Sequence, residues 1–220
     1  MPERAPIRTA VPATLMAAGL LLTGCGTPAA DVETPAAPAG GGSKSAAPAS
    51  TAPAAGAAAA AGSIGGAGTA CVLPVAFGLA KDWKPKAVEA PEDPDFAELT
   101  RQGPATVRCE VDAKPAGNIG YLRVWTAPAG PARAALEGFV KAEKGSKGAV
   151  YREAKAGALP AVEVTYAVYS EIMEETKEER AFAVATAKGT VIVHLGGLDS
   201  EEHRQMLPAY ELAKTSLKVS

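Results

Sequence analysis

Three cysteines are the most reactive side chains of this 220-residue sequence, and they occupy two different settings. A thiolate can be acylated or alkylated, bind a metal ion or pair with a second cysteine. Cys71 and Cys109 have no His neighbours for a zinc site and are not spaced as Cys-x-x-Cys. Cys25 instead ends the run Leu22-Thr23-Gly24-Cys25, whose small residues leave the backbone before the thiol accessible to an enzyme. We therefore expect different chemistry at Cys25 and at the other two cysteines.

The residues before Cys25 predict that the chain is exported and that this thiol carries lipid. Arg4 and Arg8 precede an apolar stretch at 10–22, which is too short to span a bilayer and is typical of a secretory signal. The pattern of Leu, a small residue, Gly and Cys resembles the lipobox of bacterial lipoproteins. This resemblance implies that a diacylglycerol is attached to Cys25 and that the signal peptide 1–24 is removed. The acyl chains of such an anchor hold a protein permanently on a membrane.

Cys71 and Cys109 remain as an even pair once Cys25 is lipidated. In an exported domain such a pair predicts a disulfide. The bond would close a loop of about 38 residues and stabilise the fold by roughly 3–4 kcal/mol, because it restricts the unfolded chain.

The two histidines, His194 and His203, favour neither a metal site nor general acid–base catalysis. They lie nine residues apart on different predicted elements, and the sequence lacks a Gly-x-Ser-x-Gly motif. We expect both side chains at the surface or boundary of the domain.

The strongest run of like charge is acidic. It lacks the Asp and Gly spacing of a calcium-binding loop, so we expect a solvated loop. Weak binding of a divalent cation or of a cationic partner is the alternative. The run consists of Glu171, Glu174, Glu175, Glu178 and Glu179.

Tyr121, Arg123 and Trp125 alternate along a predicted strand and therefore share one face of it. If helices cover that face, these side chains belong to the core or its boundary. If the face is uncovered, they would form the floor of a ligand groove.

The composition divides the chain after the signal into a tether and a domain. Ala, Gly, Pro, Ser and Thr account for 40 of the 45 residues at 26–70, which contain no aromatic residue. Such a segment cannot bury enough apolar surface to offset its ordering entropy, so we expect 25–70 to be a lipid-anchored, disordered linker. All the aromatic residues lie in 71–220, which has the size of one domain.

The pattern of 71–220 predicts an α+β domain with helices packed over a mainly antiparallel sheet. Apolar residues alternate in the predicted strands and recur at helical spacing in the helix that begins at Pro131. Asp199 is a good N-cap for a closing helix, which contains Pro208. The predicted strands are 73–77, 83–88, 107–111, 121–126, 162–168 and 191–195, and the predicted helices are 93–100, 131–145 and the segment after Asp199.

The segment 171–187 has two interpretations. Ser170 could cap a helix over it, or it could form an acidic hairpin loop followed by a strand. We favour the hairpin, because a strand from Ala181 pairs naturally with 191–195 through a turn at Lys188 and Gly189.

The layout of the chain resembles that of a known family. A lipobox and an Ala/Gly/Pro tether precede a first hairpin with Trp83, a helix opened by Pro131, and a closing helix with the sequence 206–211 Met-Leu-Pro-Ala-Tyr-Glu. Over about 75–220 this is similar to the LpqN-type lipoproteins of actinobacteria, whose domain has the PsbP-like (Mog/PsbP/LpqN) fold. The resemblance implies an α/β/α sandwich around an antiparallel sheet and a non-catalytic binding or accessory role. Those domains often have Pro-x-Gly-Trp where this chain has Ala-Lys-Asp-Trp83.

These observations predict a lipoprotein on the outer face of the bacterial cytoplasmic membrane. The formal charge of −2 and the lack of a basic patch argue against a nucleic-acid partner. We expect a monomer that binds a protein or a small envelope molecule, with no cofactor, metal or catalytic residue. The alternatives are a cell-envelope hydrolase that uses Asp/Glu pairs assembled by the fold, and a small solute-binding lipoprotein.

Overall fold

The computed structural model describes residues 56–171 and 173–220. The predicted signal peptide 1–24, the lipidation site Cys25 and residues 26–55 of the linker lie outside the described residues.

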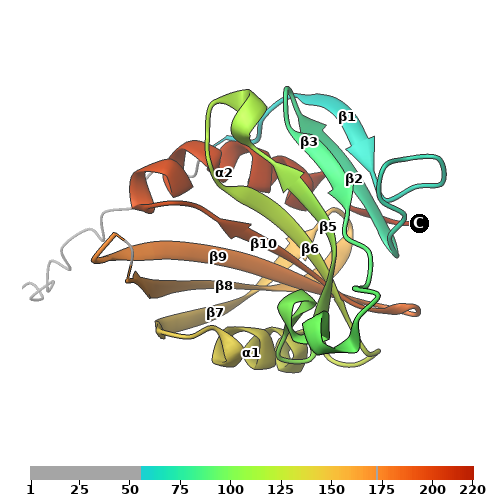
Figure 1. The fold of residues 1–220 in the computed structure, drawn as a ribbon. Coiled ribbons are helices and arrows are strands. Elements are labelled where there is room, and N and C mark those ends of the chain that lie inside the picture. The colour runs from blue at the N-terminus through green and yellow to red at the C-terminus, as the bar shows by residue number, and fades with distance from the viewer. Residues whose placement is uncertain (1–55, 172) are drawn as a thin grey trace, which may run out of the picture. The chain divides into compact units, whose positions relative to one another are not determined.

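Most of the strands form one eight-stranded antiparallel sheet (Figure 1). The strand order is β3-β5-β6-β10-β9-β8-β7, and the short β4 pairs with β5 beside β3. The strands from β7 to β10 follow one another as antiparallel neighbours through short turns, whereas residues 113–120, which include a 3-10 helix, join β5 to β6. The strands are β3 (Lys84–Ala87), β4 (Arg101–Gln102), β5 (Ala105–Asp112), β6 (Tyr121–Ala127), β7 (Ser146–Ala156), β8 (Leu159–Ser170), β9 (Glu175–Thr186) and β10 (Gly189–Gly196).

A second, three-stranded sheet carries both the first and the last strand of the described chain. Its order is β1-β2-β11, so that the central strand is flanked by the first and last strands. The helical elements complete the fold. The bounds are β1 (Ala60–Ile64), β2 (Val75–Ala80), β11 (Lys218–Val219), α1 (Ala132–Ala142), α2 (Ser200–Thr215) and the 3-10 helices η1 (Pro94–Thr100) and η2 (Lys114–Ala116).

The two α-helices pack on opposite faces of the large sheet, and each covers its own core (Figure 1). Alternation along β10 shows the division, because Val191 and Val193 contact the core under α2 while Ile192 contacts the core under α1. Helix α1 contributes Leu136 and Phe139, which are fully buried. The predicted α+β class with a mainly antiparallel sheet is therefore confirmed.

The structure differs from the sequence prediction at the boundary between linker and domain. Residues 60–64, which we assigned to the linker, form β1 and pair with β2. Ile64 is fully buried in the core and anchors this strand. Gly65 follows with φ 97°, where a Cβ would meet the Val75 carbonyl oxygen at 1.8 Å. Composition concealed the strand because backbone pairing needs few large side chains.

The hairpin interpretation of 171–187 is correct, although the strand begins earlier than expected. β9 starts at Glu175 and pairs with β8 from Ser170 to Val162. Most of the acidic run therefore lies in a strand and not in a loop. β7 was not predicted, since its side chains are largely exposed and polar. Among the described residues, no helix has the length and apolar character needed to cross a membrane.

Candidate ligand-binding groove

Helix α1 covers only part of its sheet face, and the uncovered part is a groove of about 470 Å³. Trp125 of β6 lies at the covered end, with its ring edge-on to Phe139 of α1 at 5.2 Å between centroids. Tyr121 and Arg123 continue along the same face of β6 and are half-buried where the helix no longer covers them. Of the two alternatives for this face, the groove is therefore the one that the structure contains, with Trp125 also packed into the adjoining core.

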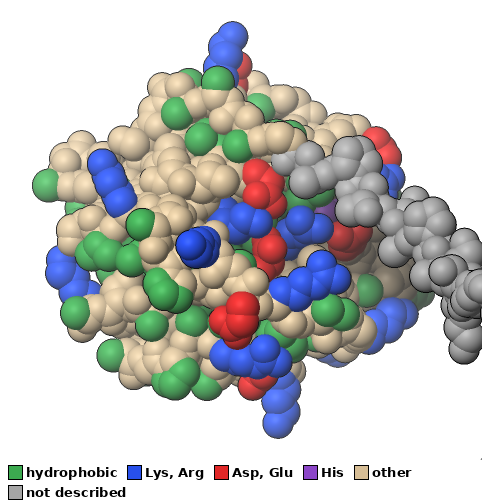
Figure 2. Space-filling model, turned by 180° about the vertical axis from the view of Figure 1, so that it is seen from behind, with side chains coloured by type: hydrophobic (Ala, Val, Ile, Leu, Met, Phe, Trp, Pro, Cys, Tyr) green, Lys and Arg blue, Asp and Glu red, His purple; other side chains and the backbone are tan. Residues whose placement is uncertain are grey.

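Charged side chains of both signs line the groove. Figure 2 shows Lys or Arg side chains interleaved with Asp or Glu side chains on one face, with a histidine among them. Arg101, Arg123 and Lys177 are the cations of the lining, and Glu143 and Glu179 are its carboxylates. These residues come from β4, β6, β9 and the end of α1, so the fold alone brings them together.

Glu179 forms a buried ionic contact at the base of the groove. Its side chain bonds Lys177 Nζ through Oε1 at 2.7 Å and His194 Nε2 through Oε2 at 2.8 Å. Burial acts to raise the pKa of Glu179, but His194 and then Lys177 together outweigh it, so this pKa lies below its usual range. Lys177 Nζ also donates to the Gly197 carbonyl oxygen at 2.7 Å. Glu179 is thus an ionised carboxylate with both oxygens occupied.

Two of our expectations are corrected at this point. Glu179 is 3% exposed, whereas we placed the whole acidic run in a solvated loop. His194 is on the predicted face of β10 but is only 7% exposed, whereas we expected a surface or boundary residue. The reason is register: β9 aligns Glu179 with Tyr166 of β8, and the ring of His194 lies between them and Phe139.

A single nitrogen of His194 meets both of its partners. The Tyr166 hydroxyl lies 3.2 Å from Nε2, the same atom that contacts Glu179. Because Glu179 is ionised, Nε2 carries the proton and donates it to the carboxylate, so it cannot also accept the Tyr166 proton. Burial, followed by the charge of Glu179, raises the pKa of Tyr166 far above its usual value. A catalytic relay needs the acid and the nucleophile on different ring nitrogens, so this arrangement fixes the ring and does not activate Tyr166.

Arg123 is held in place from two sides. Its Nε donates to Glu110 Oε2 of β5 at 2.8 Å, and its guanidinium lies 4.9 Å from the centroid of the Tyr121 ring. The second contact is a cation–π interaction, which favours a planar guanidinium over the ring face. Arg123 therefore presents its terminal nitrogens from a fixed position beside the groove.

Glu202 joins the two loops that form one rim of the groove. Its Oε1 accepts hydrogen bonds from the backbone N–H groups of Ile119 and Gly120, and its Oε2 accepts one from Leu198. The residue is in the first turn of α2, where Asp199 caps the helix by accepting from the Glu202 N–H at 2.8 Å. One carboxylate thus fixes the start of β6 relative to the end of β10.

His203 is not part of the groove, and its predicted surface position is wrong. The side chain is fully buried on α2, and neither ring nitrogen has a hydrogen-bond partner in the described part of the chain. Burial lowers the pKa of His203 to about 4, so the ring is neutral at neutral pH. No group of three or more His, Cys, Asp or Glu side chains among the described residues is placed to hold a metal ion.

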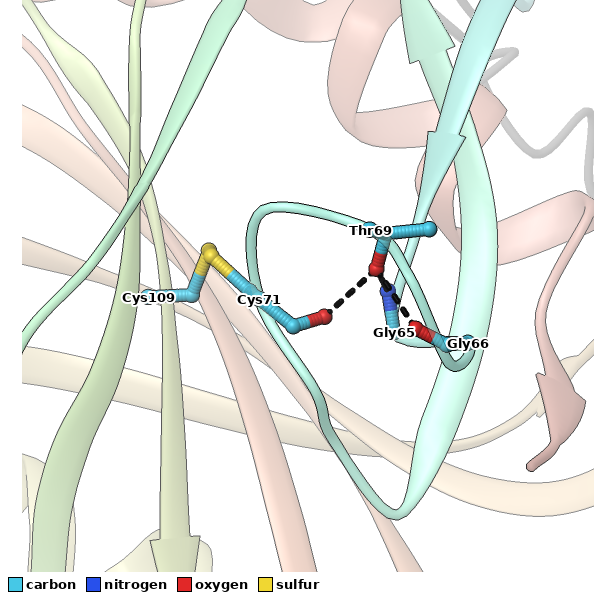
Figure 3. Close-up of a disulfide and its surroundings, with 5 residues drawn as sticks. All are labelled: Gly65, Gly66, Thr69, Cys71 and Cys109. Carbon is cyan, nitrogen blue, oxygen red and sulfur yellow. Dashed lines mark hydrogen bonds between the residues drawn. A yellow bond between two sulfur atoms is a disulfide. The ribbon is translucent and has the colours of Figure 1, made fainter.

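The predicted disulfide between Cys71 and Cys109 is present (Figure 3). It joins the loop after β1 to β5, and both cysteines are buried. The loop is braced by Thr69, whose Oγ1 lies 2.8 Å from the Cys71 carbonyl oxygen and accepts from the Gly65 N–H at 3.2 Å. The bond lies outside the groove and attaches the small sheet to the large one.

Comparison with models of known protein families assigns this chain to one family. Residues 41–217 match a family described as uncharacterised lipoproteins, and the chain belongs to this family. The expected lipoprotein membership is thereby confirmed. A comparison with curated proteins finds no match.

Among solved structures, the chain is similar to the cyanobacterial PsbP protein (CyanoP) of Synechocystis sp. PCC 6803. The alignment has 13% sequence identity and a TM-score of 0.45, and it covers 73% of this chain and 99% of CyanoP. At this TM-score the similarity supports no conclusion about function.

Proposed function

We propose that this lipoprotein is a non-catalytic binding or accessory module of the cell envelope and that it holds its ligand in the groove beside α1. The observation that carries the proposal is the sheet face that α1 leaves uncovered, where strands fix charged and aromatic side chains around a groove of about 470 Å³. Rigid strands hold such side chains in place before a ligand arrives, which reduces the entropic cost of binding.

Family membership supports the cellular context of the proposal. A lipoprotein family indicates attachment to a membrane through lipid. The lipobox at Cys25 supplies the anchor, and the residues from 26 to the start of β1 supply a spacer. We infer an LpqN-type lipoprotein with a PsbP-like domain on the outer face of the cytoplasmic membrane. Cys25→Ala should then release the protein or leave an uncleaved precursor, and unchanged membrane attachment of the variant would contradict the anchor.

A hydrolase remains the alternative because two carboxylates, Glu143 and Glu179, line the same groove. A general acid needs a pKa raised toward neutrality. The pKa of Glu179 is lowered instead, and both of its oxygens are bonded. The geometry therefore favours binding over catalysis.

Filling the groove tests the proposal. In Gly196→Leu the new side chain enters the groove, since a Cβ at this position would lie 3.4 Å from His194 Cε1 and 3.5 Å from Glu179 Oε2. Gly66→Leu is the matched control, because no atom lies within 4 Å of a Cβ there. Each full chain is purified from membranes of the producing bacterium, and the molecules that accompany it are identified by native mass spectrometry.

We expect the wild type and Gly66→Leu to retain the same molecule, and Gly196→Leu to lose it. The proposal is wrong if Gly196→Leu retains that molecule, or if the wild type retains none. Conversion of the bound molecule over time by the wild type would establish the hydrolase instead.

A further inference from the structure

Two side chains that line the groove have hydrogen-bond donors without a partner in the described part of the chain. Trp125, which lines it, is 6% exposed, and its indole Nε1 has no partner among the described residues. Arg123 uses Nε for Glu110, and its terminal nitrogens make no hydrogen bond within the described part of the chain. A buried donor without a partner costs free energy, and a ligand that supplies an acceptor removes this cost.

The carboxylates of the groove offset these donors only in part. Both oxygens of Glu179 are taken by Lys177 and His194, so its charge is compensated at the base. Glu143 is the one lining carboxylate whose side chain forms no ion pair or hydrogen bond across residues 56–171 and 173–220. An anion in the groove would therefore meet the unused terminal nitrogens of Arg123, whose charge Glu110 pairs from outside the lining, and the unpaired carboxylate of Glu143.

The rim of the groove is apolar. Leu99 is 78% exposed, Ile119 55% and Leu198 36%, and all three line the groove from different segments of the chain. The Glu202 contacts hold two of these segments together. Large aliphatic side chains gathered around a polar floor suit a ligand that has an apolar part next to its polar group.

We propose that the ligand of the groove is an acceptor-rich anion, a carboxylate or a phosphate, that carries an apolar group. Its oxygens accept hydrogen bonds from the Arg123 guanidinium and the Trp125 indole, and its apolar group contacts the rim. This inference rests on the proposed function and specifies its ligand class.

The two tryptophans of the chain, Trp83 and Trp125, provide the assay. Trp83 belongs to the core on the other face of the sheet and serves as an internal control. The full chain carrying Cys25→Ala, which blocks lipidation, is labelled with ¹⁵N, and the two indole N–H resonances are followed by NMR. The probes are octyl phosphate and octanoate, each below its micellar concentration, octanol below its solubility limit, and inorganic phosphate.

We expect octyl phosphate or octanoate to shift the Trp125 resonance downfield and to leave that of Trp83 unchanged. The probe that binds more tightly shows whether the groove prefers a phosphate or a carboxylate. Octanol and inorganic phosphate should each bind at least tenfold more weakly. Arg123→Gln should weaken binding of the anionic probe about tenfold, because it removes a charged hydrogen bond. Glu143→Gln should tighten binding of the same probe about threefold, because the substitution removes a negative charge from the groove. Arg133→Gln, on the exposed side of α1, is the matched control and should change nothing.

Several results overturn the inference while the proposed function stands. Octanol that shifts Trp125 as strongly as octyl phosphate would show a groove without preference for anions. Tighter binding of the anionic probe to Arg123→Gln, or weaker binding to Glu143→Gln, would show that the charges of the groove do not favour an anion. If inorganic phosphate binds as tightly as octyl phosphate, the apolar group makes no contribution to binding. If no probe shifts Trp125 but the membrane-purified wild type carries a molecule that Gly196→Leu lacks, the ligand class is wrong and the binding role is retained.

Discussion

Glu179 contributes stability only while it is ionised, because Lys177 and His194 both bond its carboxylate. We expect Glu179→Gln to lower the free energy of unfolding at pH 7 by about 3 kcal/mol, since breaking a buried ion pair leaves a charge uncompensated. The folded pKa of Glu179 is depressed, so its contribution is present above the unfolded pKa and is lost as pH falls through the folded value.

Urea unfolding of Glu179→Gln against wild type, at neutral and acidic pH, measures this contribution. Glu175→Gln on the exposed start of β9 is the control. An equal loss of stability in both variants would contradict a special role for the buried carboxylate.

His203 should make the fold sensitive to mild acid. Its pKa is about 4 in the folded chain, against an ordinary value of 6.5, so the unfolded chain binds the proton first. Stability therefore falls as pH drops from about 6.5 toward 4, by about 3 kcal/mol in total. His203→Leu should remove most of this loss, as measured by urea midpoints at pH 7, 5 and 4. Arg204→Leu, at an exposed neighbouring position, should keep the full loss.

Single side chains were the hardest features to predict from the sequence. His203, Met206 and Tyr210 follow the helical spacing of the buried stripe, which would have indicated a buried histidine. Glu179 alternates with Ala181 and Ala183, which face the core under α1, so its face was predictable. Its burial was not, because it depends on partners from β8 and β10 that only the folded sheet brings together.

At the scale of elements, the alternating strands, α1 and the closing helix were predicted, whereas β1, β7 and the two-residue strands β4 and β11 were not. The longer predicted elements bury a regular apolar stripe, which the sequence displays directly. β1 consists of small residues apart from Ile64, and β7 is an edge strand with a largely exposed surface. Each is positioned by pairing with the next strand of the chain, β1 with β2 and β7 with β8, and this pairing needs no buried apolar stripe. For the groove, the sequence predicted only that Tyr121, Arg123 and Trp125 would line one if helices left their strand face uncovered. Whether the groove exists depends on how far α1 extends over the sheet, which the sequence does not show.

Glu202 offers a test of how the elements around the groove are held. Glu202→Ala removes the acceptor for three backbone N–H groups, so we expect the free energy of unfolding to fall by about 2 kcal/mol. Hydrogen exchange should accelerate at Ile119, Gly120 and Leu198, where NMR can follow each amide. Glu201→Ala, at an exposed neighbouring position, should leave these three rates unchanged. If the rates in Glu202→Ala also stay unchanged, the carboxylate does not hold the rim.

At the scale of the molecule, the disulfide connects the two sheets. Removing it by Cys71→Ala together with Cys109→Ala should lower the free energy of unfolding by roughly 3–4 kcal/mol, because the unfolded chain regains the freedom of a 38-residue loop. Urea unfolding of this double variant, compared with the oxidised wild type, measures the difference. A loss below 1 kcal/mol would show that packing between the sheets holds them together without the bond.

The same bond also determines how the protein would respond to mechanical load. A chain anchored at its N-terminal end receives tension first at β1, which can peel away from β2 as far as Cys71. There the load passes through the sulfur atoms directly to Cys109 in the large sheet, and the intervening segment carries no force. Stretched between residue 25 and the C-terminus in a single-molecule experiment, the reduced chain should extend about 130 Å further than the oxidised one, the length of 38 extended residues. The crosslink thus acts as a mechanical stop that shields β2 and β3 from a pull on the anchor.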